Sequence, residues 1–253
     1  MKMKRLFTPD AEAALVRTMQ GEPLLAFDFD GTLAPIVPVP EDARIPTAVM
    51  WRLQRLAERW PVAIITGRTV DDVRKRLPFA PWRIVGSHGA EGGSEAALAQ
   101  ARAALDVARR RLDDARLDLH QHGVLLEDKS ASIALHYRLA SDRQAAVHAI
   151  AQVLAGLPPE LAVFGGKMVA NIVPAWAHDK GKALAEMVEE RGKPGAVFVG
   201  DDVNDESVFA RAEDDWFTIR VGQDYPNSQA KYLLDGTADL PRLLDMMLQA
   251  AAR

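Results

Sequence analysis

Acidic side chains gather where two apolar segments of the chain end. Asp28 and Asp30 close one segment, Asp201 closes another, and Asp205 follows shortly after. Ligands of open parallel sheets bind outside the carboxyl ends of the strands, so we expect these acids to share one site. Carboxylates gathered in one site repel one another strongly unless a cation lies among them. Since the chain has no cysteine and oxygen ligands favour hard ions, Mg²⁺ is the predicted cofactor.

Simpler explanations exist for some of these residues. Asp202 or Asp205, taken alone, fits a helix cap equally well, whereas Asp28 still lies within its apolar segment. Thr66-Gly67-Arg68 follows a further apolar segment and offers a hydroxyl and backbone donors, but a turn before a capped helix explains it as well. Lys180 is more informative, because a cation in the first turn of a helix opposes the macrodipole and favours a bound anion such as a phosphoryl group. An exposed, solvated lysine is the alternative there.

A sheet is needed to position these side chains. The segment 24–30, which becomes acidic at its far end, and the segments 62–65 and 196–199 carry apolar residues on both faces, which is typical of parallel strands covered on both sides. The predicted fold class is therefore α/β, with a Rossmann-like, doubly wound parallel sheet as the core. Between these segments the order is helix, two strands, helix, two strands, which is typical of an antiparallel sheet with helices on one face. The predicted domains are a core of residues 1–93 and 174–253 and an inserted, smaller α+β cap of residues 94–173.

The inserted segment is predicted to begin with one long helix from Ser94 to His120. Leucines recur in it every seven residues, at Leu98, Leu105, Leu112 and Leu119. One buried stripe beneath a solvated, charged face is the favoured interpretation. A dimerising coiled coil is the alternative, although four leucines barely fill the minimum number of heptads.

Composition limits the partners and the compartment. The net charge of −4 and the isoelectric point near 5.9 give no electrostatic footprint for nucleic acid or an anionic membrane. No apolar run approaches membrane-spanning length, and the N-terminal one is too short for a signal peptide. The lack of cysteine excludes disulfides and a cysteine nucleophile, and it suits a reducing cytosol. We expect a cytoplasmic protein, a monomer or weak dimer, that acts on a small molecule and not on nucleic acid or membrane.

The acids, the threonine and the lysine occur along the chain in the order of a known set of sequence motifs. Asp28–Thr32, Thr66, Lys180 and Gly200–Asp205 resemble the four motifs of the haloacid-dehalogenase superfamily. A wider set resembles the trehalose-6-phosphate phosphatase family and extends over about residues 24–210. This resemblance implies a phosphoric monoester hydrolase that converts trehalose 6-phosphate, a small-molecule sugar phosphate, to trehalose and phosphate. The additional segments of the wider set are Gly86–Glu91, Glu127–Lys129 and His136–Arg138.

The resemblance also implies a role for each residue. Asp28 would attack phosphorus and form an aspartyl phosphate. Asp30 would protonate the departing sugar oxygen and then take a proton from the attacking water. Thr66, Lys180 and the cation would offset charge on the phosphoryl oxygens. The implied catalytic residues are Asp28, Asp30, Thr66 and Lys180, and the implied Mg²⁺ ligands are Asp28, the backbone carbonyl of Asp30, Asp201 and, in support, Asp205.

Substrate recognition is implied for a second group of residues, three of which lie in the predicted cap. Ordinary alternatives are a solvated turn for Lys129, a pair with Asp142 for Arg138 and a structural hydrogen bond for His88. Related phosphatases usually carry a glutamate where this chain has Asn171, so a neutral contact would replace a charge-assisted one. The implied substrate-binding residues are Thr66, Gly67, Arg68, His88, Glu91, Lys129, Arg138 and Asn171.

Rival functions share parts of this pattern. The nearest is a phosphatase for another sugar phosphate, such as glucosylglycerol, sucrose or mannosylglycerate phosphate, because the same core would serve it. A phosphomutase would need its cap to retain a bisphosphorylated intermediate, and the large insertion argues against a response-regulator receiver. From another class, a non-catalytic sugar-phosphate sensor has no need of a nucleophile with an acid/base.

Overall fold

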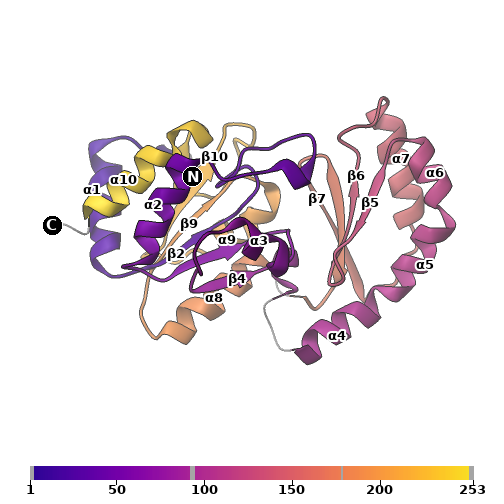
Figure 1. The fold of residues 1–253 in the computed structure, drawn as a ribbon, viewed down its shortest axis with the longest axis horizontal. Coiled ribbons are helices and arrows are strands. Elements are labelled where there is room, and N and C mark those ends of the chain that lie inside the picture. Colours follow the sequence, from indigo (N-terminus) through magenta and orange to yellow (C-terminus); the bar gives the residue numbers. More distant parts are fainter. Residues whose placement is uncertain (1–2, 92–94, 178, 251–253) are drawn as a thin grey trace. The chain divides into compact units, whose positions relative to one another are not determined.

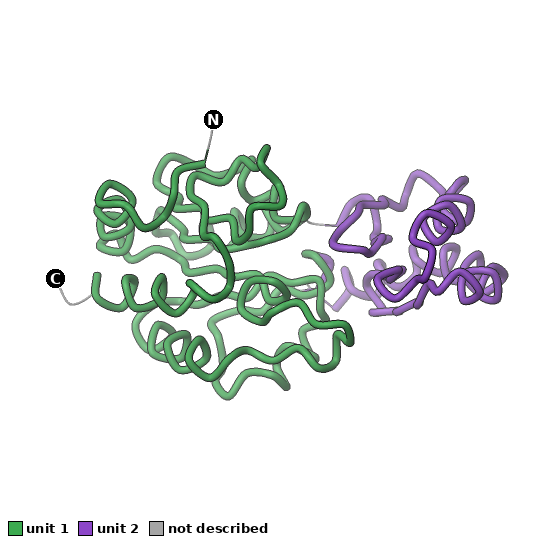
Figure 2. The backbone as a smooth tube through the Cα atoms, turned by 90° about the horizontal axis from the view of Figure 1, so that it is seen from above, with its two compact units in different colours: residues 1–89, 179–253 green, residues 90–178 purple. Residues whose placement is uncertain are grey.

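The chain forms two compact units. The computed structural model describes residues 3–91, 95–177 and 179–250. Unit 1 comprises residues 1–89 and 179–253, and unit 2 comprises residues 90–178, as Figure 2 shows in two colours. The predicted domain boundary after residue 93, and the start of the helix predicted from Ser94, lie outside the described residues.

Unit 1 is built on a seven-stranded sheet in which every neighbouring pair of strands is parallel. Its strands are β1 (Lys4–Arg5), β2 (Leu24–Phe27), β3 (Val62–Ile65), β4 (Arg83–Val85), β9 (Ala196–Gly200), β10 (Phe217–Val221) and β11 (Tyr232–Leu234). Their order across the sheet is β1-β11-β10-β9-β2-β3-β4. Strands β10, β9, β2 and β4 of this sheet are labelled in Figure 1. The strand that carries Asp28 at its end, β2, therefore lies between β3 and β9, near the middle of the sheet.

Helices cover both faces of this sheet, because its strands are apolar on both sides. Leu25 and Phe27 of β2 pack into a core with helices α1 (Pro9–Gln20), α2 (Thr47–Ala57) and α10 (Leu240–Ala250). Leu24 and Ala26 point the other way, into a core with α8 (Lys180–Arg191) and α9 (Glu206–Arg211). The predicted doubly wound α/β core is confirmed. The remaining short elements are α3 (Val70–Arg76), η1 (Pro40–Asp42), η2 (Ser87–Gly89), η3 (Val203–Asp205) and η4 (Thr237–Asp239).

Unit 2 is a smaller α+β unit with its own core. Its strands β5 (Leu125–Asp128), β6 (Ile133–His136), β7 (Leu161–Gly166) and β8 (Val169–Pro174) form a four-stranded antiparallel sheet in the order β5-β6-β8-β7. Helix α7 (Arg143–Leu154) lies between the two strand pairs in sequence, as predicted. Ile133, Leu135 and Ile172 of the sheet pack against apolar residues of the helices.

The predicted long helix of unit 2 is interrupted twice. Three helices replace it, α4 (Glu95–Ala104), α5 (Asp106–Asp114) and α6 (Arg116–Gln121). The breaks lie at Leu105, with φ −78° and ψ −9°, and at Ala115, with φ −94° and ψ 3°. Both conformations lie near the bridge region, where the helical hydrogen-bond ladder is locally lost. The buried stripe is confirmed for Leu105, Leu112 and Leu119, which lie in the core of unit 2 itself and not on a dimer seam, whereas Leu98 is only partly buried.

In the part of the chain that the structure describes, none of the helices combines the length and the apolar character that crossing a membrane requires.

Candidate active site

The nucleophile candidate Asp28 follows directly after β2 at the carboxyl edge of the unit 1 sheet. Its backbone N–H donates to the carbonyl of Val199 in β9 at 2.9 Å, which continues the sheet by one residue. The Asp28 residue is buried, with 5% of its surface exposed. A carboxyl group in this position is desolvated and needs partners of opposite charge.

Lys180 supplies the first of these partners. It is the first residue of α8, which begins where the Asp179 carboxylate accepts the N–H of Lys182 at 2.7 Å. The Lys180 residue is 2% exposed, so it is not a solvated surface lysine. Its Nζ lies 2.8 Å from Asp28 Oδ1 and 2.7 Å from Asp205 Oδ1. One ammonium therefore joins the end of β2 to the loop that follows β9.

Three buried carboxylates converge beside this lysine. One oxygen from each of Asp28, Asp201 and Asp205 lies within 4.8 Å of the other two. Thr32 Oγ1 donates to Asp201 Oδ1 at 3.3 Å. Gly31 makes the approach of Asp201 possible, because its φ is +85° and a Cβ there would lie 2.0 Å from Asp201 Oδ2.

The two aspartates that resembled helix caps have different roles. Asp202 is the N-cap of η3, and its side chain accepts the N–H of Val203 at 2.7 Å. Asp205 is fully buried, and its Oδ2 accepts the N–H groups of Asp201 and Asp202 at 2.8 and 2.9 Å. Asp205 therefore holds the loop with one oxygen and binds Lys180 with the other.

Electrostatics at the cluster favour an added cation. Burial raises the pKa of Asp28 well above its ordinary range, Lys180 opposes that shift, and the charges of Asp205 and Asp201 reinforce it. Burial alone would lower the pKa of Lys180, but the charges of Asp205 and Asp28 outweigh it and raise that pKa, so the ammonium stays protonated. Three carboxylates thus face one ammonium, and all of the candidate ligands are oxygens. This donor set fits a hard divalent cation such as Mg²⁺.

Asp30, two residues beyond the nucleophile candidate, is paired with Arg68. The Arg68 guanidinium contacts both oxygens of Asp30, Nε to Oδ2 at 2.7 Å and Nη2 to Oδ1 at 2.8 Å. Its Nη1 donates to Asp72 at 2.7 Å, and Nη2 also donates to the carbonyl of Pro40 at 2.6 Å. The Phe29 ring lies beneath it, with the guanidinium carbon 5.2 Å from the ring centroid. Arg68 is therefore fixed from four sides.

Thr66 and His88 meet at the end of the neighbouring strand. Thr66 follows β3 and is fully buried, and its Oγ1 accepts the N–H of Arg68 at 3.1 Å. His88 donates its backbone N–H to the carbonyl of Thr66 at 2.9 Å and has a φ of +60°. Its ring lies against Gly67, where a Cβ would come within 2.4 Å of His88 Cε1. Gly67 is thus a site of close packing.

The other four predicted substrate residues belong to unit 2. Lys129 Nζ lies 3.4 Å from Glu127 Oε2, and its side chain is 10% exposed, so it is not a solvated turn residue. Glu127 Oε2 also contacts His136 Nε2 at 2.8 Å. Burial raises the pKa of Glu127, but the contacts with His136 and Lys129 outweigh it, and the net shift is downward.

Asn171 lies in β8 at the centre of the unit 2 sheet, opposite Ala134 and Phe164. It is 2% exposed, and its Nδ2 has no hydrogen-bond partner among the described residues. Arg138 Nη2 donates to the carbonyl of Lys167 at 3.2 Å, while Asp142 serves as the N-cap of α7. The fourth of these residues, Glu91, is partly buried.

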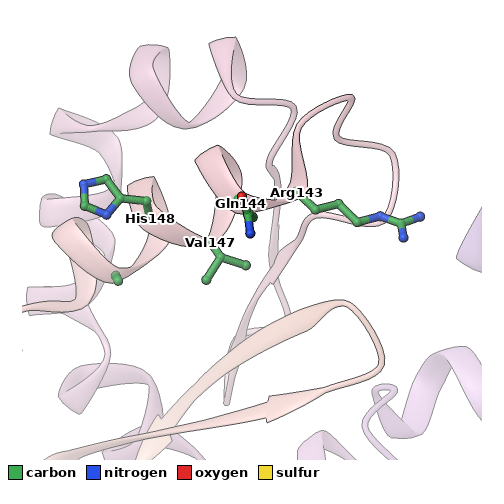
Figure 3. A pocket seen from close by; sticks show the side chains of 5 residues that line it. Arg143, Gln144, Val147 and His148 are labelled. Carbon is green, nitrogen blue, oxygen red and sulfur yellow. The ribbon is translucent and has the colours of Figure 1, made fainter.

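A surface hollow elsewhere in unit 2 has a different character. In Figure 3 the side chains of Arg143 and His148 point away from one another on the same helix, α7. All of its lining residues come from that helix, and none is acidic. The hollow therefore does not bring a set of catalytic or metal-binding side chains together. Its lining residues are Arg143, Gln144, Val147, His148 and Ala151.

Comparison with known proteins identifies the family. The trehalose-phosphatase family profile matches residues 26–235. The chain belongs to the trehalose-phosphatase family. It is 36% identical over 215 residues to the trehalose-phosphate phosphatase of Mycolicibacterium paratuberculosis, a match that covers 79% of this chain and 55% of that protein. It is 33% identical over 213 residues to a probable trehalose-phosphate phosphatase of Sinorhizobium fredii, covering 81% and 80% respectively. The chain thus spans about half the length of the mycobacterial relative.

Solved structures share the fold of this family member. The C-terminal domain of the C. albicans trehalose-6-phosphate phosphatase superposes with a TM-score of 0.76 at 19% identity, covering 99% of this chain and 98% of that one. A protein described as related to trehalose-6-phosphate phosphatase gives a TM-score of 0.70 at 24% identity, covering 91% of this chain and all of that one. The fold is therefore that of phosphatases with a core and an inserted cap.

Several residues of the site were given no role in the sequence analysis. Thr32 binds Asp201 and had a signal, since it belongs to the same short motif as Asp28. Asp72 lies in the first turn of α3, where an acid is expected for helix stability alone. Asn204 Nδ2 lies 3.5 Å from His88 Nδ1, a contact between segments far apart in sequence. Asn204 belongs to the motif Gly200–Asp205, but no local pattern could have predicted its contact with His88.

Proposed function

We propose that this chain is a Mg²⁺-dependent phosphatase that hydrolyses trehalose 6-phosphate to trehalose and phosphate. The observation that carries the proposal is the buried contact of Lys180 with Asp28 and Asp205, beside Asp201 at the carboxyl edge of the sheet. Membership of the trehalose-phosphatase family supports the substrate. Unit 1 would supply the chemistry, and unit 2 would act as the cap that selects the sugar.

Asp28 would accept and release the phosphoryl group, and Asp30 would transfer the proton in each of the two steps. An Asp28 oxygen attacks phosphorus, the bond from phosphorus to the sugar oxygen breaks, and the leaving oxygen takes a proton from Asp30. Water then attacks the aspartyl phosphate and gives its proton to Asp30, which releases phosphate and restores Asp28. The bidentate contact with Arg68 fixes the plane of the Asp30 carboxylate, the form that takes the proton from water. Asp30 enters the first step with that proton, retained from the preceding turnover, on one of its two oxygens.

The remaining core residues would stabilise charge. Lys180 and the Thr66 hydroxyl would contact the phosphoryl oxygens, and the positive end of α8 adds to the field there. Asp28, Asp201 and the backbone carbonyl of Asp30 would hold Mg²⁺, with Asp205 in support. When bound, the cation would neutralise developing charge on the phosphoryl group.

Residues of the cap would contact the sugar. Lys129, Arg138, Glu91 and Asn171 are the candidates in unit 2, and His88 and Gly67 are candidates in unit 1. The buried Asn171 amide, whose Nδ2 lacks a partner among the described residues, is available to donate to a sugar hydroxyl. We further propose a cytoplasmic location and a monomer or weak dimer.

A second candidate is a phosphatase for a different sugar phosphate. Asn171 favours it, because an amide stands where related enzymes usually carry a carboxylate, and an amide both donates and accepts. The same catalytic core would serve either substrate. A sensor without catalysis has less support, since an acid/base candidate, Asp30, lies two residues beyond the nucleophile candidate Asp28.

The test is a phosphate-release assay on a panel of sugar phosphates. Wild type and Asp28→Asn are compared with Mg²⁺ and with chelator, and Asp71→Asn, whose side chain is 79% exposed, is the matched control. Release that is selective for trehalose 6-phosphate, dependent on Mg²⁺ and lost only in Asp28→Asn supports the proposal. Selectivity for another sugar phosphate would keep the mechanism and change the substrate. Folded protein without release from any substrate would refute the enzyme and leave the sensor.

A further inference from the structure

Arg220 is the largest fully buried side chain among the described residues, with 1% of its surface exposed. It lies in β10, directly opposite Gly200 of β9, the residue that precedes Asp201. Its strand neighbours Ile219 and Val221 pack into the core with α1, α2 and α10, so Arg220 points to the other face of the sheet. A guanidinium buried there needs several partners to offset its desolvation.

Those partners lie in the two segments that follow β9 and β10, namely the loop with the first residue of α9, and the loop before β11. Arg220 Nη1 lies 3.2 Å from the carbonyl oxygen of Asp202 and 3.2 Å from Glu206 Oε1. Its Nη2 lies 3.2 Å from Asp224 Oδ1, and its guanidinium carbon lies 5.1 Å from the ring centroid of Tyr225. One side chain therefore ties the loop that carries the acids to the loop between β10 and β11.

Glu206 reinforces the same connection. Its second oxygen, Oε2, accepts the backbone N–H of Gln229 at 2.9 Å, while Oε1 receives Arg220. The Glu206 side chain is only 15% exposed, so the pair is largely shielded from water. Shielding strengthens the attraction between the two charges and makes the loss of either one costly.

We propose that Arg220 is a positioning residue for the cation site: it fixes the loop from which Asp201 and Asp205 reach the metal. This inference rests on the proposed Mg²⁺ site. Arg220 acts through the backbone of Asp202 and through Glu206, which lie on either side of the loop's turn. Asp205 Oδ2 in turn accepts the N–H groups of Asp201 and Asp202, so a shift of Asp202 displaces both carboxylates.

Lysine cannot reproduce this arrangement. Arg220 reaches a backbone carbonyl, two carboxylates and an aromatic face at once, through a rigid planar group. A lysine ammonium is a single point charge on a flexible stem. Arg220→Lys should therefore keep the charge but lose the alignment of the loop.

The test measures Mn²⁺ binding in the absence of substrate, from the paramagnetic resonance signal of the free ion. Wild type is compared with Arg220→Lys, Arg220→Met and the double variant Arg220→Met/Glu206→Gln, in which no carboxylate is left unpaired at position 206. Arg83→Met, which breaks an exposed pair with Glu190, is the control. We expect the Mn²⁺ dissociation constant to rise about tenfold or more in all Arg220 variants and to stay unchanged in the control.

Activity provides a second readout. The Mg²⁺ concentration for half-maximal phosphate release should rise by the same factor, while the KM for trehalose 6-phosphate at saturating Mg²⁺ stays near the wild-type value.

Variants that are less stable but bind Mn²⁺ like the wild type would overturn the inference and leave Arg220 a purely structural residue. Should Arg220→Met not fold, Arg220→Lys and Glu206→Gln decide the question by the same criterion. Absence of Mn²⁺ binding by the wild type would refute the proposed metal site itself, and this inference with it.

Discussion

Arg68 donates hydrogen bonds to both carboxylate oxygens of Asp30, with Nε 2.7 Å from Oδ2 and Nη2 2.8 Å from Oδ1. Two parallel N–H···O contacts fix the plane of the carboxyl group as well as its position. Arg68 is held in its turn by Asp72 and by the carbonyl of Pro40. The orientation of the candidate acid/base is therefore set by residues that belong to unit 1 alone.

Replacing this guanidinium should affect turnover more than binding. Arg68→Lys loses the planar, two-point contact, and we expect kcat for sugar phosphate hydrolysis to fall about tenfold to a hundredfold because Asp30 is misoriented. KM should change little, and steady-state kinetics provide the measurement. Arg83→Lys, in the exposed pair with Glu190, is the matched control and should retain wild-type rates. A large rise in KM with an unchanged kcat would instead make Arg68 a substrate ligand.

Removing the buried ammonium should destabilise the folded chain. Lys180→Met leaves the carboxylates of Asp28 and Asp205 without their counter-charge, and breaking a buried pair in this way costs about 3–5 kcal/mol. Urea unfolding at neutral pH without Mg²⁺ measures the loss. Lys182→Met, two residues further along α8 and exposed, should cost less than about 0.5 kcal/mol. Equal stabilities of the two variants would contradict the role of Lys180 as the counter-charge.

A single methyl group at Gly31 should disable the site. Gly31 has a φ of +85°, and a Cβ there would lie 2.0 Å from Asp201 Oδ2. Gly31→Ala is therefore strained by about 1–2 kcal/mol in its backbone alone, and it also displaces Asp201. We expect loss of Mn²⁺ binding and of phosphate release. Gly236→Ala is the control, since φ there is −176° and no atom lies within 4 Å of the added Cβ. Normal Mn²⁺ binding by Gly31→Ala would rule out this crowding.

Acid should weaken the ion pairs around Asp72. Burial raises the pKa of Asp72, but hydrogen bonds from Arg76 and Arg68 outweigh it, so the folded-state pKa is below the ordinary value. A lowered pKa gives stability that is present above the unfolded pKa, about 4, and that is lost as pH falls through the folded value. Wild type should therefore be more stable than Asp72→Asn at neutral pH, and the difference should shrink below about pH 4.

Denaturant unfolding at a series of pH values measures that difference. Asp71→Asn is the matched control, because Asp71 is the preceding residue and its side chain is 79% exposed. A stability difference between wild type and Asp72→Asn that does not vary with pH would contradict the assignment.

The sheet and the acids at its edge were predictable from sequence for one physical reason. Strands buried on both faces must be continuously apolar, so Leu24–Phe27 and Ala196–Val199 stand out, and the acids that follow them stand out equally. Lys180 was predictable because it contradicts the helix dipole. These signals are local, and each needs only a few consecutive residues.

Other features depend on distant partners and left no local signal. Arg220 joins the site only because β10 lies beside β9, a matter of strand order. The pairing of Arg68 with Asp30 depends on side-chain conformations across two loops. The helix breaks lie at Leu105 and Ala115, two residue types with high helix propensity. The packing of the three short helices against the sheet of unit 2 therefore outweighs the local preference for one continuous helix.

The central place of β2 has a consequence for synthesis. Leu25 pairs with Val62 on one side and with Val197 on the other, so the second neighbour of the nucleophile strand emerges from the ribosome much later than the first. All strand pairs of unit 2 lie within it among the described residues, and its sheet can close in the meantime. The nascent chain therefore exposes an open, apolar edge at β2 until β9 arrives, and an unpaired edge of this kind favours aggregation and chaperone binding.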